Sequence, residues 1–261
     1  MKKIHIRRLV ITISFLLMPI TFAYLSPVIP IWGALSGVIS GSVILFSVLF
    51  LSSMLIGRLF CAWLCPFGGA SECVMYAVNK PVKNSKPLHI VRHVIWLAWL
   101  GSIIFVALSA GGYSTVDPFY HTYMGLSLHT EGGRGYAIYF VILALCVILT
   151  LVFGKRSGCH GICHIANFMI FGKKLGRLLR LPRVHMKMDS VECVSCDKCT
   201  LACPMSLDVE DMVKKQDTEN PYCILCGDCT KECSKGVIQL AFGRPDKKDN
   251  NRNNRHLDNA K

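Results

Sequence analysis

Two runs of cysteines near the C-terminal end constrain this 261-residue chain more than any other feature. Each run reads C-x2-C-x2-C-x3-C; the first comprises Cys193, Cys196, Cys199 and Cys203, and the second comprises Cys223, Cys226, Cys229 and Cys233. This spacing is typical of loops that place three thiolates around one [4Fe-4S] cluster and send the fourth to a neighbouring cluster. Zinc sites usually use two C-x2-C pairs with a longer gap, which would leave the third and fourth cysteines of both runs unexplained. The runs therefore predict iron–sulfur clusters and electron transfer.

The segment around these runs, residues 189–243, resembles the bacterial two-cluster ferredoxins. Twenty positions separate Cys203 from Cys223, which fits a pseudo-twofold α+β module with two clusters side by side. The resemblance implies that one cluster is held by Cys193, Cys196, Cys199 and Cys233, and the other by Cys223, Cys226, Cys229 and Cys203. Ser234 replaces the usual proline after the second run, which changes the local turn but removes no ligand.

Four apolar segments precede this module, at about 9–29, 34–57, 90–110 and 136–153. About 20 helical residues cross the roughly 30 Å of hydrocarbon in a bilayer, so we expect four transmembrane helices within residues 1–172. The first segment follows basic residues and could be a signal peptide, but no small-x-small cleavage site follows it. We expect a retained helix, kinked at Pro19. The predicted fold class is thus a mainly α membrane protein, a four-helix bundle followed by the ferredoxin-type module.

Basic residues in the flanks predict the orientation. Residues 1–8 hold four Lys or Arg, 58–92 hold five and 154–192 hold eight, whereas 26–33 hold none and 111–135 hold one. By the positive-inside rule, both termini and the clusters face the cytoplasm, and the chain lies in the inner (cytoplasmic) membrane. Contact with membrane lipid also explains the net charge of +13 without a nucleic-acid partner, because residues 189–243 carry five Lys and ten Asp or Glu.

Two polar segments flank the module. Residues 173–188 form a basic linker, whose first part is expected to be either a short surface helix or a soluble connection. Residues 244–261 are too polar to bury a core, and we expect a disordered tail there.

A second cysteine pattern, C-x3-C, occurs twice, at Cys61 and Cys65 and again at Cys159 and Cys163. Each copy follows an even-numbered apolar segment, so the two halves form an internal repeat of about 98 residues and predict a pseudo-twofold bundle. Residues i and i+4 of a helix share one face, so the four sulfurs could meet near the axis. Such a quartet would suit a thiolate metal site, a redox-active dithiol or a quinone contact. Buried packing is the alternative, because free cysteine also packs as a small apolar residue.

Other groups offer weaker signals. In the outer loop 111–135, His121 is a candidate quinone or partner contact, with His129 and Glu131 nearby; interfacial aromatic anchoring is the alternative. Haem is not expected, because Cys163-His164 lacks the C-x2-C-H spacing and no second histidine inside a span faces His93. We identify no catalytic triad or nucleotide loop, so the chemistry is expected to reside in bound cofactors.

Together, the four apolar segments, the doubled C-x3-C motif with Pro66 after the first copy, and the two C-terminal runs resemble the NapH and MauN group of membrane-bound ferredoxin-type proteins, whose larger relatives include NosR and CcoG. The resemblance spans residues 5–243. It implies quinol oxidation from the quinone pool and electron delivery to a respiratory reductase or cytochrome partner, as in a quinol dehydrogenase component. The alternative is an assembly or maturation factor for a metalloenzyme that donates electrons or senses redox state. His164 stands where the family pattern has proline, so the second motif departs from it.

Overall fold

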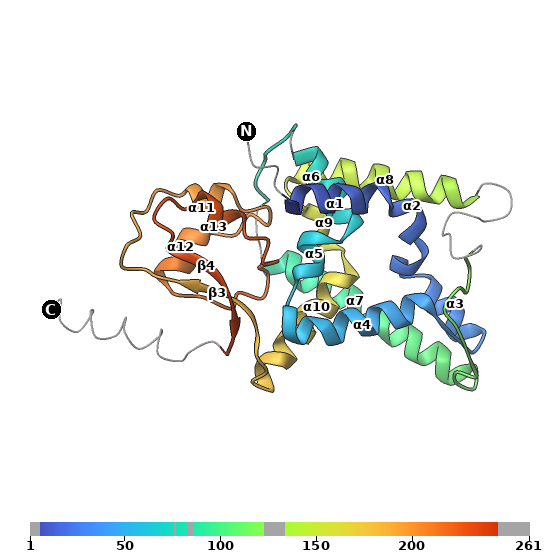
Figure 1. The fold of residues 1–261 in the computed structure, drawn as a ribbon. Helices are drawn as coiled ribbons and strands as arrows, with labels where there is room; N and C mark the ends of the chain where they lie inside the picture. The colour runs from blue at the N-terminus through green and yellow to red at the C-terminus, as the bar shows by residue number, and fades with distance from the viewer. Residues whose placement is uncertain (1–5, 76, 83–85, 123–133, 245–261) are drawn as a thin grey trace.

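The computed structural model describes residues 6–75, 77–82, 86–122 and 134–244, which are mostly helical. A larger helical part contains α1 to α10, and a smaller part contains β3, β4 and the short helices α11 to α13 (Figure 1). The connection after α10 joins the two parts.

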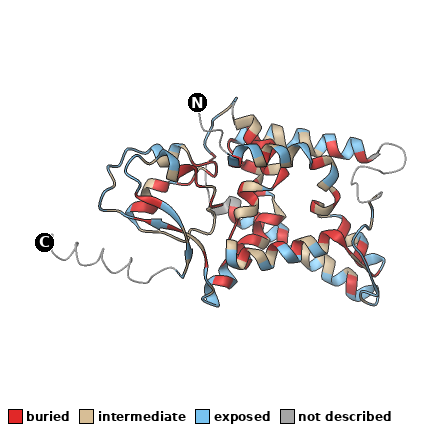
Figure 2. Ribbon diagram, viewed as in Figure 1, coloured by how far each residue is buried: buried red, intermediate tan, exposed pale blue. Residues whose placement is uncertain are grey.

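Within the described residues, two helices are long and apolar enough to cross a membrane. They are α7 (Lys86–Ser109) and α8 (Arg134–Phe153), and the apolar spans within them run His89–Ser109 and Gly135–Phe153. Large apolar side chains on both remain exposed, with Phe105 72% and Phe140 61% accessible. Figure 2 shows the same exposure along α8, at the upper edge of the helical part. An apolar surface of this extent supports membrane association.

The first two expected spans have different bounds in the structure. The segment 9–29 is divided into α1 (Ile6–Leu16), α2 (Met18–Thr21) and a 3-10 turn η1 (Ala23–Leu25), with Pro19 in the first turn of α2. A proline has no N–H for the preceding helix, which explains the break.

The segment 34–57 is not one helix either. It contains the end of α3 (Ile29–Leu35), the strand β1 (Val38–Ser40) and the 16-residue α4 (Gly41–Ile56). Gly37 ends α3 with a positive φ of 67°, and β1 then pairs in parallel with β2 (Thr115–Asp117). The apolar helix α4 is therefore about 24 Å long at 1.5 Å per residue, shorter than expected.

The two halves of the helical part interlock. In the first half, α5 (Leu59–Trp63) and α6 (Pro66–Met75) follow α4; in the second, α9 (Ser157–Gly161) and α10 (His164–Leu178) follow α8. Helix α6 packs on α1 and on α8, whereas α10 packs on α7 and on α4. The last helix of each half thus contacts the long helix of the other half. The two repeated halves of the helical part therefore exchange helices.

The predicted linker 173–188 contains the end of a helix and a strand. Helix α10 continues through Leu178 and packs on α4; it buries Lys173 and Gly176, whereas Lys174 and Arg177 remain exposed. The remainder of the predicted linker includes strand β3 (Arg183–Met188), which pairs antiparallel with β4 (Ile238–Gly243). The smaller part therefore begins near residue 183 rather than 189. Most of the predicted tail, 245–261, lies outside the described residues.

Three short helices complete the smaller part: α11 (Lys198–Leu201), α12 (Val209–Lys214) and α13 (Asp228–Glu232). Helix α12 fills the interval between the two cysteine runs, and Asp208 caps it by accepting a hydrogen bond from the Asp211 amide at 2.9 Å. Apolar residues of both parts join one core, with Met169 and Ile165 from α10 and Met186 and Val213 from the smaller part. The two parts are thus continuous in the interior.

Candidate metal centres

The two C-terminal cysteine runs fold into loops of matching backbone geometry. Ser195 and Asp197 in the first loop, like Leu225 and Gly227 in the second, have φ between 49° and 78°. Three of these four residues are not glycine, and left-handed geometry is uncommon for such residues except at turns and functional sites. Alternating left-handed residues turn successive N–H groups to one side and form anion-binding concavities. The repeated geometry therefore suits two identical anionic clusters.

The loops bring the cysteines together in two separate cavities. The first is lined by Cys203, Cys223, Cys226 and Cys229 with apolar neighbours such as Met186 and Ile224. The second is lined by Cys193, Cys196, Cys199 and Cys233, with Ser234 and Val213. Each set combines the first three cysteines of one run with the fourth cysteine of the other run. This is the exchange that the ferredoxin resemblance implies.

The two cavities differ in burial. Cys203 and Cys229 are buried, whereas Cys196 in the other set is exposed. Burial raises the pKa of the Cys203 thiol to about 11, so its ligand form requires a cation to displace the proton. The set around Cys223 lies toward the helical part, because Leu225 approaches Gly57: a Cβ on that glycine would lie 3.0 Å from the leucine side chain. The set with Cys196 faces solvent.

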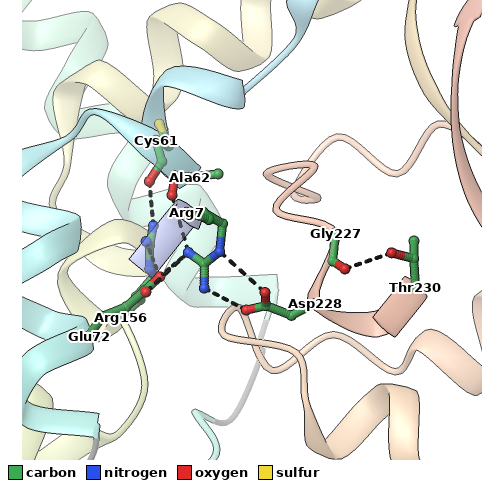
Figure 3. Close-up of polar contacts among 8 residues, drawn as sticks. All are labelled: Arg7, Cys61, Ala62, Glu72, Arg156, Gly227, Asp228 and Thr230. Atoms are coloured by element: carbon green, nitrogen blue, oxygen red, sulfur yellow. Dashed lines mark hydrogen bonds and ion pairs between the residues drawn. The ribbon is translucent and has the colours of Figure 1, made fainter. Parts of the chain in front are cut away.

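A buried ion network fastens the smaller part to the helical part (Figure 3). Arg7 of α1 donates from Nη2 to Asp228 Oδ2 at 2.6 Å, and from Nη1 to Glu72 Oε1 at 2.8 Å. Arg156 donates from Nη2 to the same Glu72 oxygen at 2.5 Å. Burial opposes ionisation of Glu72, but Arg156 and Arg7 outweigh it and keep its pKa below the usual value. Two cations and two carboxylates therefore balance.

The two C-x3-C motifs have nearly the same backbone structure. The Cys61 amide bonds to the Arg58 carbonyl at 3.0 Å, and the Cys159 amide bonds to the Arg156 carbonyl at 2.9 Å. The Cys65 amide bonds to Phe60 O, and the Cys163 amide bonds to Gly158 O, each at 3.0 Å. Both motifs then enter a helix, α6 or α10. The sequence repeat is thus a structural repeat.

The structure also brings the four sulfurs of these motifs near one another. Burial raises the pKa of Cys65, and the neighbouring thiols of Cys61, Cys163 and Cys159 raise it further. Arg156 donates from Nη1 to the Cys61 carbonyl at 2.6 Å and thereby joins the second motif to the first. Cys61 Sγ also lies 3.5 Å from Met169 Sδ. We call these four cysteines the inter-repeat quartet.

Two buried arginines near the inter-repeat quartet have no carboxylate partner among the residues that the structure describes. Arg58 is 0% exposed and Arg92 is 1% exposed. Arg92 donates to Asn167 Oδ1 at 2.9 Å and to the Cys159 carbonyl at 3.0 Å, and Arg58 donates to the Tyr222 carbonyl at 3.1 Å. Nε and Nη2 of Arg58 and Nη2 of Arg92 have no hydrogen-bond partner in the described structure.

The sequence did not identify these arginines as interior residues, although the repeat carried a signal. Arg58 and Arg156 each precede the first cysteine of their motif by three positions. It also did not identify a stack of rings: His160 lies 6.0 Å from His89, which stacks on Tyr222 at 4.0 Å. Tyr222 immediately precedes Cys223, so the stack connects the inter-repeat quartet with the ferredoxin-type part.

An apolar groove lies between α4, α7 and α10. It is lined by 14 residues, among them Phe46, Trp96, Trp99 and Phe168. The ring of His164 lies behind this wall, 5.2 Å from Phe46 and 5.4 Å from Trp99. Burial lowers the pKa of His164 to about 4, and a hydrogen bond to the Leu25 backbone opposes this. His164 Nε2 is buried and has no partner among the described atoms.

His121, the quinone or partner contact that the sequence suggests, lies elsewhere. Its exposed ring packs 4.9 Å from Trp32 and 4.5 Å from Tyr120, and it is not among the residues lining the groove. His129 and Glu131 fall outside the described residues. In the described part of the chain, no three His, Cys, Asp or Glu side chains converge closely enough to hold a single metal ion, and this includes all three cysteine quartets.

Comparison with known proteins identifies two iron–sulfur segments. A family described as "4Fe-4S binding domain" matches residues 40–85, and one described as "4Fe-4S dicluster domain" matches residues 192–238. The ferredoxin-type part is therefore called the dicluster module below. No solved structure matches the chain.

Similar proteins come from an archaeon and a bacterium. MJ0749 and MJ0750 of Methanocaldococcus jannaschii, both named as uncharacterised proteins, are 24% and 22% identical to this chain over 74% and 75% of its length, and 68% and 76% of theirs. The "Putative electron transport protein YccM" of Escherichia coli is 22% identical over 77% of this chain and 56% of that protein. Together with the two 4Fe-4S segments, this similarity supports an iron–sulfur electron-transfer function.

Proposed function

We propose that this chain is a multi-pass protein of the cytoplasmic membrane that oxidises quinol and passes the electrons through two [4Fe-4S] clusters to a respiratory reductase or cytochrome partner. The observation that carries the proposal is the apolar groove, bordered by Trp96 and Trp99 and backed by His164. Ligand sites of this kind combine a mostly apolar lining with a few polar groups. A quinone needs both, because its ring and tail are apolar and its oxygens exchange protons.

The proposed topology follows from the basic flanks and the apolar helices. Segments 9–29, 34–57, 90–110 and 136–153 cross or enter the membrane, with both termini and the dicluster module on the cytoplasmic side. The interrupted first and second segments are accommodated because irregular backbone at membrane depth is tolerated where protein covers it. Leu25, between α2 and α3, is 3% exposed and belongs to the shared core.

The protein's part in the reaction is to bind the quinol and take its first proton. Oxidation of one quinol to quinone releases two electrons and two protons. His164 is neutral at pH 7 because burial lowers its pKa to about 4, and its unpartnered Nε2 is the proposed acceptor for the first proton once the wall of Phe46 and Trp99 moves aside. The second proton passes to water. Bound [4Fe-4S] clusters would each take one electron. Their ligands would be Cys223, Cys226, Cys229 and Cys203 near the helical part and Cys193, Cys196, Cys199 and Cys233 toward solvent.

The order of burial suggests the direction of electron flow. The cavity with buried Cys203 and Cys229 adjoins the helical part, and the cavity with exposed Cys196 is accessible to a partner. A quinol-derived electron would therefore enter at the first and leave at the second.

The test is anaerobic reduction of the clusters by quinol in proteoliposomes, followed by bleaching of absorption near 400 nm. His164→Phe should slow reduction by quinol at least tenfold while dithionite still reduces both clusters, because only the proton acceptor is lost. His121→Phe is the matched control and should keep the wild-type rate. If quinol fails to reduce the wild-type protein, the proposal is wrong.

One observation favours a second function. The thiol of Cys61 and the thioether of Met169 lie 3.5 Å apart, and such soft ligands select Cu(I). In that case the chain would be a maturation factor that supplies electrons to a metal centre. Copper-dependent reoxidation of dithionite-reduced clusters, together with no response to quinol, would favour this function.

A further inference from the structure

The segment that matches the 4Fe-4S binding domain does not by itself contain enough cysteines to ligate a cluster. The segment 40–85 contains three cysteines, Cys61, Cys65 and Cys73. A cubane held by protein thiolates usually takes four. The structural repeat supplies two more sulfurs at the right place, because Cys159 and Cys163 lie close to Cys61 and Cys65.

The charge around the inter-repeat quartet is unbalanced without a bound group. Arg7 and Arg156 are matched by Glu72 and Asp228, but Arg58 and Arg92 are buried without a carboxylate in the described structure. An isolated buried charge is strongly unfavourable, so proteins pair such charges or place them against a metal centre.

Cys61, Cys65, Cys159 and Cys163 are free cysteines, so all four sulfurs are available as ligands. A bound cation would displace the four thiol protons and convert the set to thiolates. Four thiolates around a cluster core with two positive charges leave a double negative charge, which matches the two unpaired guanidinium groups.

We infer that Cys61, Cys65, Cys159 and Cys163 together bind a third iron–sulfur cluster, shared between the two halves of the helical part. The match of residues 40–85, which contain Cys61 and Cys65, to a 4Fe-4S binding domain favours a cluster over a single ion. The site also adjoins the dicluster module, because Arg58 beside Cys61 donates to the carbonyl of Tyr222, the residue before Cys223. This inference goes beyond quinol oxidation and does not depend on it.

The decisive measurement is the iron and acid-labile sulfide content of the full-length protein, purified anaerobically. Two cubanes account for about eight iron atoms, so the wild type should contain about two to four more. The double variant Cys61→Ser/Cys159→Ser should return to about eight and lose one component of the Mössbauer spectrum. Cys73→Ser is the matched control, since Cys73 lies in α6 outside the inter-repeat quartet, and should keep the wild-type content.

Several results would overturn the inference. One is a wild type with about eight iron atoms; another is a double variant with unchanged iron. A stoichiometric zinc or copper ion that is lost with the inter-repeat quartet would also overturn it, because the site would then hold a single ion. The wild-type count decides even if the double variant fails to accumulate.

A charge variant gives an independent readout. Arg58→Met preserves much of the side-chain volume but removes one unpaired guanidinium. If an anionic cluster is present, this variant should lose part of the extra iron or shift the third cluster to a lower reduction potential. If the quartet holds only neutral thiols, removal of the buried charge should instead raise the Tm and leave the iron content unchanged, which would contradict the inference.

Discussion

Replacing Asp228 with Asn tests how the dicluster module is held on the helical part. Asp228 accepts from Arg7 Nη2 at 2.6 Å and from Arg7 Nε at 3.2 Å, and the two side chains are 11% and 2% exposed. Removing one partner of a buried ion pair typically costs about 3–5 kcal/mol. Asn keeps one hydrogen-bond acceptor and Arg7 keeps Glu72, so we expect the lower value of about 2–3 kcal/mol.

This free energy should appear in the opening of the interface. At about 1.4 kcal/mol per factor of ten, the population of undocked module should rise by about 30- to 140-fold. Hydrogen exchange of peptides covering residues 222–233 reports that opening, because exchange of protected amides follows local opening equilibria. The rate of electron transfer into the clusters should fall as well.

Asp211→Asn is the matched control. Asp211 pairs with Lys215 on the exposed face of α12, where the two side chains are 47% and 71% accessible. Exposed pairs contribute little, so this variant should exchange like the wild type. If Asp228→Asn also exchanges like the wild type while retaining its iron, the buried network does not fasten the module, and the reasoning fails.

Two further predictions concern the clusters and the topology. Cys199 and Cys203 belong to one run but line different cavities. Cys199→Ala and Cys203→Ala should therefore each remove about four iron atoms, from different clusters. Spectra that change in the same way for both variants would contradict the exchanged ligand sets. A periplasmic reporter should be active when fused after Gly112 and inactive after Gly243, and the reverse pattern would invert the proposed orientation.

The sequence grouped the cysteines as they line the two cavities, because ligand spacing is a local property. Cys193, Cys196 and Cys199 lie within seven residues, so one loop conformation decides how they meet. The repeat of the C-x3-C motif was equally local, and the structure reproduces its backbone hydrogen bonds. The left-handed φ of 58° at Leu225 could not be foreseen, because nothing in the side chain favours it; the surrounding loop imposes it.

The sequence predicted less about where charge would be buried. Arg58, Arg92 and Arg156 were counted as cytoplasmic flank charges, yet the structure places them in the interior with exposed fractions of 0%, 1% and 0%. A charge count cannot separate a residue that faces anionic lipid from one that faces a buried site. That distinction depends on tertiary contacts such as the bond from Arg92 to Asn167, which are 75 positions apart.

The exchange of helices between the two halves also could not be predicted from the sequence, because it depends on close packing at two small residues in α10. A Cβ on Gly172 would lie 2.5 Å from the carbonyl oxygen of Phe50 and would also overlap Ser53 Oγ. One on Gly176 would lie 2.9 Å from Met54 Cα. Helix α10 therefore reaches the backbone of α4 only because it has glycine at these positions.

Gly172→Ala should consequently lower the Tm, measured by circular dichroism in detergent. Alanine in a helix interior gains about 1 kcal/mol over glycine, but overpacking a close contact costs about 1–3 kcal/mol, and here the obstacle includes backbone that cannot rotate away. Gly101→Ala in α7 is the matched control, because a Cβ there meets nothing within 4 Å. It should keep or raise the Tm. Equal Tm values for the two variants would show that α10 does not depend on close contact with α4, and the interlocked arrangement of the halves would have to be abandoned.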